Sequence, residues 1–398
     1  MSWICFAGFP STPSETVGYL LAYVFATIGH TSICVFGINH FLGYPFPKWF
    51  MRPVRHANTL IGVFGPVLIG WCFWLGWSYF AASWWGWCII GYLALCLLMG
   101  MVIAPVSHVL YWQRRRKPVA LSSNHSEVLD VVEQLGYKPL GTGKKRILAQ
   151  LPGNEIFRVE FNEKHIALPS LPEAWEGLSI LHLTDLHFRG VPDKEFFRKV
   201  LEHCQRWKPD IVAITGDITD SFQHHRWILP ILGRLHWKEH AFAILGNHDD
   251  LYQPEVSRRR LKKLGMEVLG NRWTQVTVRG LPMIAVGHEG PWIPPVPDLT
   301  DCPEGIFRLC LSHTPDNIGW AKRHHIDLML SGHNHGGQIR FPFLGSVFVP
   351  SKSGRRYDCG SFHEPPTFLH VSRGLSGQYP VRYNCKPEVT FLVLHKGY

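Results

Sequence analysis

The chain has 398 residues, of which 46% are hydrophobic and 13% aromatic, and its formal net charge is +10 at pH 7. A chain of this length usually holds more than one domain. Outside residues 114–117 the chain has no long basic run. The positive charge therefore fits an anionic bilayer surface better than a nucleic acid. The ten Cys include no Cys-x-x-Cys pair, which disfavours a thiolate zinc site and favours free thiols in a reducing compartment.

Three apolar stretches dominate the first third of the chain. They cover residues 17–41, 60–82 and 84–112, and none contains Lys, Arg, Asp or Glu. A helix needs about 20 apolar residues to cross a bilayer, so each stretch is long enough. No basic segment precedes the first stretch and two more stretches follow it, which argues against a signal peptide. The sequence therefore predicts a transmembrane region of about three helices over residues 1–116.

The flanking charges predict an orientation. Three basic residues lie between the first and second stretches, no charge lies between the second and third, and basic residues fill positions 114–117. Because positive loops favour the cytoplasmic side, we expect a multi-pass protein of the inner (cytoplasmic) membrane, with the lipid bilayer as a partner and the catalytic domain in the cytoplasm. His30 and His108 interrupt the stretches, and helix packing or an interfacial position explains them better than an intramembrane site.

The segment 117–150 is polar and weakly patterned, and we interpret it as a linker. Within it, SEVLDVVEQLG predicts a short helix that begins at Ser126 and ends at Gly136. After the linker, EIFRVEFNEKHIAL alternates with a period of two residues and predicts a strand.

Residues 151–398 form the predicted catalytic domain. Buried strands are predicted at SILHLTD, DIVAITGD and AFAILGNHD, and helices at DKEFFRKVLEHCQRW, RWILPILGRLHW and PEVSRRRLKKLG. The tail, which includes FLGSVFVP, PTFLHVSRG and PEVTFLVLHKG, indicates strands and turns. This order predicts an α/β domain in which a mostly mixed sheet packs against a second sheet. Ligand sites in such folds lie at the carboxyl ends of the strands.

Short polar clusters fall at those strand ends. Each follows an apolar run, and the clusters are Asp185-Leu186-His187, Gly216-Asp217, Gly246-Asn247-His248-Asp249, His313 and Gly332-His333-Asn334-His335. Each alone has a structural explanation, since an Asp-x-His or a Gly-Asp is commonly a turn, and Asp249 can satisfy backbone N–H groups at a helix start. Their order and shared position after strands favour a site for metal ions.

The residue types suit two metal ions. Two ions about 3.5–4 Å apart clamp a phosphoryl group and generate hydroxide near neutral pH. They need oxygen ligands, imidazoles and a bridging carboxylate. Asp217 offers the bridge and Asn247 an amide oxygen. His248 is placed to donate a proton to the leaving oxygen or to stabilise charge on the phosphate.

The ordered clusters closely resemble those of the calcineurin-like metallophosphoesterases, over about residues 152–398. The endings SHTPDN, GHNHGGQIRFP and SRGLSGQYPVRYNCKPEV resemble the bacterial membrane-associated branch of predicted phosphohydrolases. The resemblance implies a four-layer αββα sandwich, with two mixed sheets flanked by helices. Here the sandwich is expected after an N-terminal all-α transmembrane region.

The resemblance also implies roles for these residues. Two sets of ligands would share Asp217: Asp185, His187, Asp217 and His335 for the first metal, and Asp217, Asn247, His313 and His333 for the second. His248 would assist the leaving group, Asp249 would orient His248, and a metal-bridging hydroxide would attack phosphorus in line. The family uses two divalent metal ions, manganese, iron, zinc or others, and nothing in the chain selects among them.

Other polar residues carry weaker predictions. Asp220 is expected to cap a loop, and His182 to pack within a strand. Arg189 and Arg373 are suited to pair with a phosphate, although a surface position is the default for both. The segment 288–289 is expected either to line the pocket or to form a solvated loop.

We therefore predict a membrane-anchored, metal-dependent phosphoric ester hydrolase of the phosphodiesterase or pyrophosphohydrolase type. Its substrate would be a phosphomonoester, phosphodiester or diphosphate. The anchor favours a lipid-linked substrate such as UDP-2,3-diacylglucosamine, whose pyrophosphohydrolases belong to this superfamily, although some of them carry Arg where this chain has His248.

Other functions stay open at this point. A general phosphodiesterase on soluble or nucleotide esters is the first alternative, and an inactive membrane scaffold that retains the fold is the second. A transporter or sensor is disfavoured because the apolar stretches hold no ionisable residue other than His. No nucleic-acid partner is expected.

Overall fold

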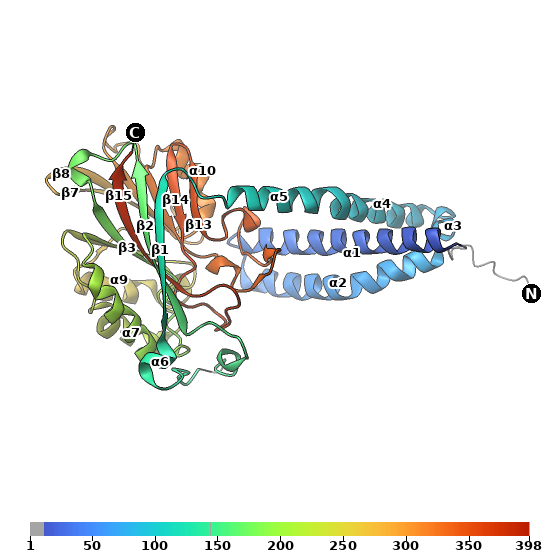
Figure 1. Cartoon of the computed structure of the whole chain (residues 1–398), viewed down its shortest axis with the longest axis horizontal. Coiled ribbons are helices and arrows are strands. Elements are labelled where there is room, and N and C mark those ends of the chain that lie inside the picture. Colours follow the sequence, from blue (N-terminus) through green and yellow to red (C-terminus); the bar gives the residue numbers. More distant parts are fainter. Residues whose placement is uncertain (1–11, 144, 398) are drawn as a thin grey trace, which may run out of the picture. The chain divides into compact units, whose positions relative to one another are not determined.

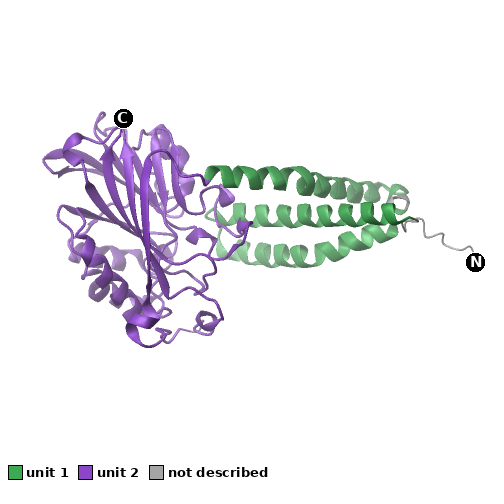
Figure 2. Cartoon of the chain, in the orientation of Figure 1, with its two compact units in different colours: residues 1–114 green, residues 115–398 purple. Residues whose placement is uncertain are grey.

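The computed structural model describes residues 12–143 and 145–397 and divides into two compact units, residues 1–114 and 115–398 (Figure 2). The nine cysteines in the described ranges are all free, as expected from the sequence, and Cys5 lies outside those ranges. The predicted domain boundaries stay predictions.

The first unit is helical (Figure 1). Its helices are α1 (Pro13–Leu42), α2 (Lys48–Leu75), α3 (Trp77–Ala81), α4 (Trp84–Leu98) and α5 (Ala104–Arg114), with a π-helical turn at Met99–Ile103 between the last two. Three spans are long and apolar enough to cross a membrane: Pro13–Leu42, Lys48–Leu75 and Trp84–Arg114. The second ends before the predicted residue 82, because Gly76 has a φ of 78° and breaks the helix.

Close packing holds the helices of this unit together. A Cβ atom at Gly29 would lie 1.8 Å from the carbonyl oxygen of Cys96, so only glycine permits this approach of α1 and α4. His30 is buried and shares hydrogen bonds with the Tyr92 hydroxyl (2.6 Å) and the Ile61 carbonyl (3.0 Å). His30 therefore joins three helices, which supports the prediction of a packing histidine.

Two mixed sheets form the second unit. The first has the order β1-β2-β15-β3-β4-β5-β6 and the second β13-β14-β10-β9-β8-β7, while β11 and β12 form a separate hairpin. The strands of the first sheet are β1 (Leu121–Asp130), β2 (Arg158–Leu168), β3 (Leu178–Leu183), β4 (Ile211–Thr215), β5 (His240–Ile244), β6 (Glu267–Val268) and β15 (Glu388–Lys396). Those of the second sheet are β7 (Trp273–Val278), β8 (Leu281–His288), β9 (Arg308–Ser312), β10 (Leu328–Ser331), β13 (Gly360–Glu364) and β14 (Thr367–Val371), and the hairpin holds β11 (Arg340–Phe341) and β12 (Gly345–Ser346).

Each sheet contains a run of four parallel strands. In the first sheet β3, β4, β5 and β6 are parallel neighbours, and in the second β8, β9, β10 and β14 are. Parallel strands end at the same edge of a sheet, so the loops that follow them lie close together. This edge is where the polar clusters fall.

Helices cover the outer faces of the two sheets. They are α6 (Val131–Leu135), α7 (Lys194–Cys204), α8 (Ile228–Leu232), α9 (Pro254–Lys263) and α10 (Ile318–Arg323). Phe196 of α7 packs in the cluster outside the first sheet, and Ala321 of α10 in the cluster outside the second. Between the sheets, Phe242 and Leu309 belong to a third cluster and are fully buried. The predicted four-layer sandwich is confirmed.

Two local predictions in this unit are wrong in part. Residues from Ser126 to Asp130 form the end of β1 rather than a helix, because β1 pairs with β2 along its length. The helix is only α6, which begins where the Asp130 carboxylate accepts hydrogen bonds from two backbone N–H groups. It ends at Gly136 as predicted, where φ is 74°. β1 thus lies inside the segment that was interpreted as a linker.

Two further elements are shorter than predicted. RWILPILGRLHW holds the end of the 3₁₀ helix Phe222–Trp227 and the short α8, and the helix stops because the chain turns at Gly233. FLGSVFVP contributes only Gly345–Ser346 to a strand, because it pairs with β11 alone.

Candidate metal centre

Five polar residues of the predicted site hold a left-handed backbone. The φ angles are 53° at Asp185, 45° at His187, 52° at Asp217, 68° at His333 and 49° at His335. Non-glycine residues rarely adopt such angles, and where they do the surrounding structure enforces them, often at functional sites. The loops after β3, β4 and β10 are therefore shaped to direct these side chains.

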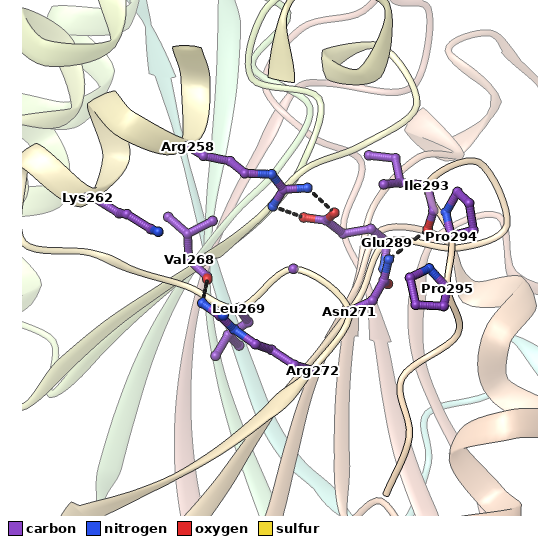
Figure 3. A pocket seen from close by; sticks show the side chains of 11 residues that line it. Arg258, Lys262, Val268, Leu269, Asn271, Arg272, Glu289, Ile293, Pro294 and Pro295 are labelled. Atoms are coloured by element: carbon purple, nitrogen blue, oxygen red, sulfur yellow. Dashed lines mark hydrogen bonds and ion pairs between the residues drawn. The ribbon is translucent and has the colours of Figure 1, made fainter. Parts of the chain in front are cut away.

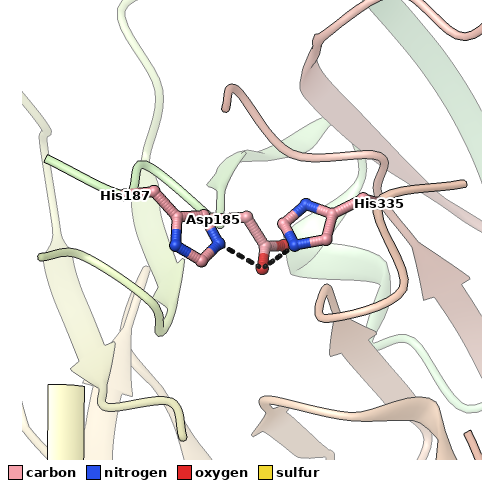
Figure 4. Close-up of side chains that lie close together, drawn as sticks. All are labelled: Asp185, His187 and His335. Atoms are coloured by element: carbon pink, nitrogen blue, oxygen red, sulfur yellow. Dashed lines mark ion pairs between the residues drawn. The ribbon is translucent and has the colours of Figure 1, made fainter. Parts of the chain in front are cut away.

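The first cluster consists of Asp185, His187 and His335 (Figure 4). Nε2 of His187 and Nε2 of His335 each lie 3.8 Å from Oδ1 of Asp185. Nε2 of His187 also lies 3.5 Å from Oδ2 of Asp217. These separations are too long for hydrogen bonds. Accordingly, the buried Nε2 of His187 has no hydrogen-bond partner among the described residues.

The second cluster consists of Asp217, His313 and His333. Contacts outside the cluster orient its two histidines. Nδ1 of His313 lies 2.8 Å from the carbonyl oxygen of Thr215, and Nε2 of His333 lies 2.9 Å from that of Pro350. A carbonyl oxygen only accepts, so each of these nitrogens donates its proton outward. In the neutral imidazoles the opposite nitrogens, Nε2 of His313 and Nδ1 of His333, then carry lone pairs.

These lone pairs point at other electron-pair donors. Nε2 of His313 lies 2.9 Å from Oδ1 of Asn247, 3.4 Å from Oδ2 of Asp217 and 3.2 Å from Nδ1 of His333. Lone pairs that face one another repel, so either a proton on an imidazole or a cation must lie between them. Metal bonds of about 2.0–2.2 Å place neighbouring ligand atoms at such separations. The residues therefore fit divalent cations that share Asp217.

In the absence of a cation, the carboxylates favour protons on two of the histidines. Burial lowers the pKa of His187, but Asp220, Asp185 and Asp217 outweigh this effect and hold it well above the usual value. Burial likewise opposes a proton on His313, yet Asp217 raises its pKa to about 9. Burial lowers the pKa of His335 to about 3. The same carboxylates that attract protons are thus available to attract metal ions.

Asp220 connects the first cluster to His248. Its Oδ1 atom lies 2.9 Å from Nδ1 of His187 and 2.8 Å from Nδ1 of His248, and its Oδ2 atom lies 3.2 Å from the Arg189 guanidinium. Asp220 is therefore not the predicted loop cap. It fixes the ring of a cluster residue and that of the partly exposed His248, whose Nε2 remains for a ligand. Its spacing of three residues after Asp217 was the signal available in the sequence.

Asp249, which was expected to orient His248, contacts backbone groups instead. The Asp249 carboxylate accepts hydrogen bonds from the backbone N–H groups of Gly246, Ile218 and Thr219, and within the described residues none joins it to His248. Burial and the nearby Asp217 raise the pKa of Asp249 to about 7. Asp249 therefore ties the loop after β5 to the loop after β4. This agrees with the other role expected from the sequence, in which the Asp249 carboxylate satisfies backbone N–H groups.

Two glycines make room for the carboxylates. A Cβ atom at Gly332 would lie 2.3 Å from Oδ2 of Asp185, and one at Gly246 would lie 2.2 Å from Oδ1 of Asp217. Neither distance is compatible with a side chain. The glycines in the sequence clusters therefore have a direct role in bringing the loops together.

Two of the weaker predictions concern residues held away from a phosphate. Arg373 is partly buried and pairs with Glu388 (3.0 Å) and Glu160 (3.1 Å), so two carboxylates already hold its guanidinium. His182 is fully buried and lies 2.9 Å from the Thr215 hydroxyl, as expected for a packed histidine.

Glu289 lines a pocket of about 300 Å³ that is separate from the metal centre (Figure 3). Its carboxylate accepts the backbone N–H of Leu245 (2.7 Å) and pairs with Arg258 (2.5 Å). Lys262 and Arg272 also line this pocket. Glu289 is fully buried, so the solvated loop is excluded and the residue anchors the strand end before Gly246.

Two neighbours of the centre were missed. The ring of Trp292 lies 4.5 Å from that of His333 and 6.0 Å from that of His313, so it covers the second cluster. Arg382 is fully buried and donates to the carbonyl oxygen of His335 (2.9 Å). A lone Trp or Arg gave no signal in the sequence.

Comparisons with known proteins agree with this geometry. The family model for calcineurin-like phosphoesterases matches residues 178–337. Phosphodiesterase YaeI of Escherichia coli is 31% identical over 224 residues, which cover 54% of this chain and 81% of the relative. The chain belongs to the calcineurin-like phosphoesterase family. It is accordingly a metal-dependent phosphoester hydrolase.

Two further relatives show the range of names in the family. The uncharacterized metallophosphoesterase YkuE of Bacillus subtilis is 29% identical over 249 residues, covering 60% of this chain and 87% of the relative. The UDP-2,3-diacylglucosamine pyrophosphatase LpxG of Chlamydia muridarum is 23% identical over 273 residues, covering 54% of this chain and 83% of the relative.

Proposed function

We propose that this chain is a multi-pass enzyme of the inner membrane that hydrolyses a phosphodiester or diphosphate at a two-metal centre facing the cytoplasm. The observation that carries the proposal is the position of Asp217, whose Oδ2 atom lies 3.5 Å from Nε2 of His187 and 3.4 Å from Nε2 of His313. One carboxylate oxygen thus borders both clusters, as a bridging ligand must.

Each metal ion would have its own set of ligands. The first set is Asp185, His187, Asp217 and His335, and the second is Asp217, Asn247, His313 and His333. When bound, the ions would neutralise phosphoryl charge and supply an activated water. Manganese, iron and zinc all suit this mixture of oxygen and nitrogen ligands.

His248 would move the proton. Its backbone N–H donates to Oδ1 of Asp217 (2.9 Å), so its position is tied to the shared carboxylate. Asp220 accepts from Nδ1, which leaves Nε2 to protonate the leaving oxygen. A lipid-linked ester is the favoured substrate, supported by the three helices long enough to span a membrane and by the similarity to LpxG.

Metal-dependent hydrolysis by the full chain in detergent tests the proposal. The assay uses bis-p-nitrophenyl phosphate with manganese, before and after chelation. Asp217→Asn should abolish turnover and reduce bound metal measured by atomic emission. Asp250→Asn, an exposed carboxylate nearby, is the matched control and should retain both. Full activity of Asp217→Asn, or no activity of the unaltered chain with any divalent metal, would show that the proposal is wrong.

The orientation has an independent test. A phosphatase reporter fused at the C-terminus, which is active only in the periplasm, should stay inactive, whereas a fluorescent protein at the same point should fold. An active phosphatase would place the centre outside the cytoplasm.

A further inference from the structure

The hairpin that follows the metal-centre histidines, residues 339–348, exposes a dense set of large apolar side chains. They are Ile339 (39% exposed), Phe341 (51%), Phe343 (89%), Leu344 (45%) and Phe348 (61%). Elsewhere in the described part of the second unit, exposed large apolar residues are more widely spaced along the chain. Exposed apolar side chains gathered in one place mark an interaction surface, whereas single ones need no explanation.

The base of this hairpin is firmly anchored. Asp358 is fully buried and accepts hydrogen bonds from the Arg340 guanidinium (2.8 Å) and the Ser346 hydroxyl. The Arg355 guanidinium donates to the carbonyl oxygen of Leu344 (2.7 Å). The exposed side chains therefore project from a fixed support.

The segment that holds the hairpin has a net positive charge, although Arg340 pairs with Asp358 and Arg356 with Glu364. Residues 338–356 include four Arg or Lys and no Asp or Glu. Aromatic side chains with flanking basic residues are typical of segments that lie in the interface of a bilayer, where the rings enter the head-group region and the bases meet anionic lipids. The net positive balance favours an anionic bilayer as the partner, and the chain already holds helices that suit a membrane.

The hairpin borders the metal centre at its far end. Pro350 lies two residues after the hairpin. Its carbonyl oxygen accepts from Nε2 of His333 (2.9 Å) and so fixes that ring. A substrate group in contact with the hairpin would therefore lie near the second cluster.

A second connection links the start of the hairpin to Asp220. Gln338 donates to the carbonyl oxygen of Tyr379 (2.8 Å), and Arg189 donates both to the adjacent carbonyl of Gln378 (2.7 Å) and to Asp220 (3.2 Å). The surface thus adjoins the proposed proton-transfer residues as well as the metal ligands.

We propose that residues 339–348 enter the interface of the bilayer and that the substrate is a phosphoester whose other group is a lipid held there. The spanning helices would then tether the enzyme, while the hairpin would bring the centre to the lipid head groups. The substrate part rests on the proposed function, and the membrane contact does not.

Photocrosslinking in the full chain tests the membrane contact. The chain is reconstituted in nanodiscs of phosphatidylethanolamine and phosphatidylglycerol, with p-benzoylphenylalanine in place of Phe341 or Phe348. Irradiation should yield lipid adducts of the hairpin peptides, identified by mass. The same amino acid in place of Phe222, which is 59% exposed at another site, should yield none. Equal adducts at the two places, or none at the hairpin, would overturn the contact whatever the activity.

Kinetics test the substrate part. The triple variant Phe341→Ser/Phe343→Ser/Phe348→Ser should lose about tenfold or more of its activity toward a hexadecyl phosphodiester embedded in the nanodisc, because apolar contact area is lost. Activity toward soluble bis-p-nitrophenyl phosphate should remain, and Phe222→Ser should change neither. Equal activities of variant and unaltered chain on the embedded ester would overturn the lipid assignment and leave the proposed function intact. Absence of activity on both esters in the unaltered chain would instead contradict the proposed function.

Discussion

The metal centre and the hairpin of residues 339–348 are neighbours in the chain and depart from the usual distribution of side chains in opposite directions. At the centre, charged side chains such as Asp185 and Asp217 are at most 1% exposed. In the hairpin, Phe343 is 89% exposed. A buried charge requires a counter-charge, and gathered exposed apolar side chains mark an interaction surface, so each region takes a partner under the two proposals. Under the two proposals, the chemistry and the choice of substrate would reside in adjacent but separate parts of the unit.

The largest expected effect concerns His248. His248→Ala should reduce turnover of bis-p-nitrophenyl phosphate by about 10²–10⁴-fold, the usual contribution of a positioned acid. Metal content should stay the same, since His248 is placed outside both proposed ligand sets. The exposed His236 provides the control His236→Ala, which should be fully active. A loss below tenfold would assign the proton to another group.

The second largest effect is expected from a substitution of Asp220. Asp220→Asn removes the charge between His187 and His248, and loss of such an outer carboxylate typically weakens metal binding or activity by about 10–100-fold. The pH profile of turnover should shift with it, which a purely structural change would not cause. Asp249→Asn should instead lower the melting temperature, because Asp249 accepts three backbone N–H groups. The reverse pattern would restore the role first predicted for Asp249.

A smaller effect is expected from pH. His187 and His313 have raised pKa values in the metal-free chain, about 9 for His313, so both hold protons at pH 7 that metal ions must displace. Metal affinity should therefore rise with pH, by about tenfold per unit for each proton released, and the contribution of His313 should level off above about pH 9. Calorimetry at pH 7 in two buffers of different ionisation heat counts the protons. Binding without proton release would show that both imidazoles are already neutral at pH 7, contrary to their raised pKa values.

The smallest expected effect is that of Phe348→Ala on stability. Comparing it with a substitution between the sheets distinguishes the hairpin from the core. Phe348→Ala should change the free energy of unfolding by less than about 0.5 kcal/mol, because its ring is exposed. Phe368→Ala, at 1% exposure between the sheets, should lower it by about 3–5 kcal/mol. Denaturation of both variants in the same detergent gives the comparison. A large loss for Phe348→Ala would mean that the hairpin serves the fold rather than a partner.

The parts of this molecule that the sequence predicted share a physical cause. β3, β4 and β5 are short apolar runs that end in polar residues, and buried parallel strands require that pattern. The polar clusters that follow these strands lie at one edge of the sheet, because parallel strands end at the same edge. β1 was misjudged because its register with β2 overrides a helical spacing of apolar residues.

The partners of each site residue were harder to predict. Asp220 and Asp249 are both acidic residues close to the clusters, and only the fold decides which one faces His248. Arg382 and Trp292 reach the histidines from distant segments, so no local pattern revealed them. FLGSVFVP, which covers the second half of the hairpin, was predicted as strand and turn because its residues are apolar, and burial cannot be derived from composition.

The left-handed backbone of the ligand loops has a consequence for the life of the protein in the cell. A non-glycine residue in this conformation costs about 1–3 kcal/mol, and five of them lie in three short loops. A cation bound at the proposed centre would offset this cost by drawing the side chains inward. The loops of the metal-free chain should therefore open before the sheets do, and proteases should cut there first. Supply of metal would in this way set how long each new copy of the enzyme survives.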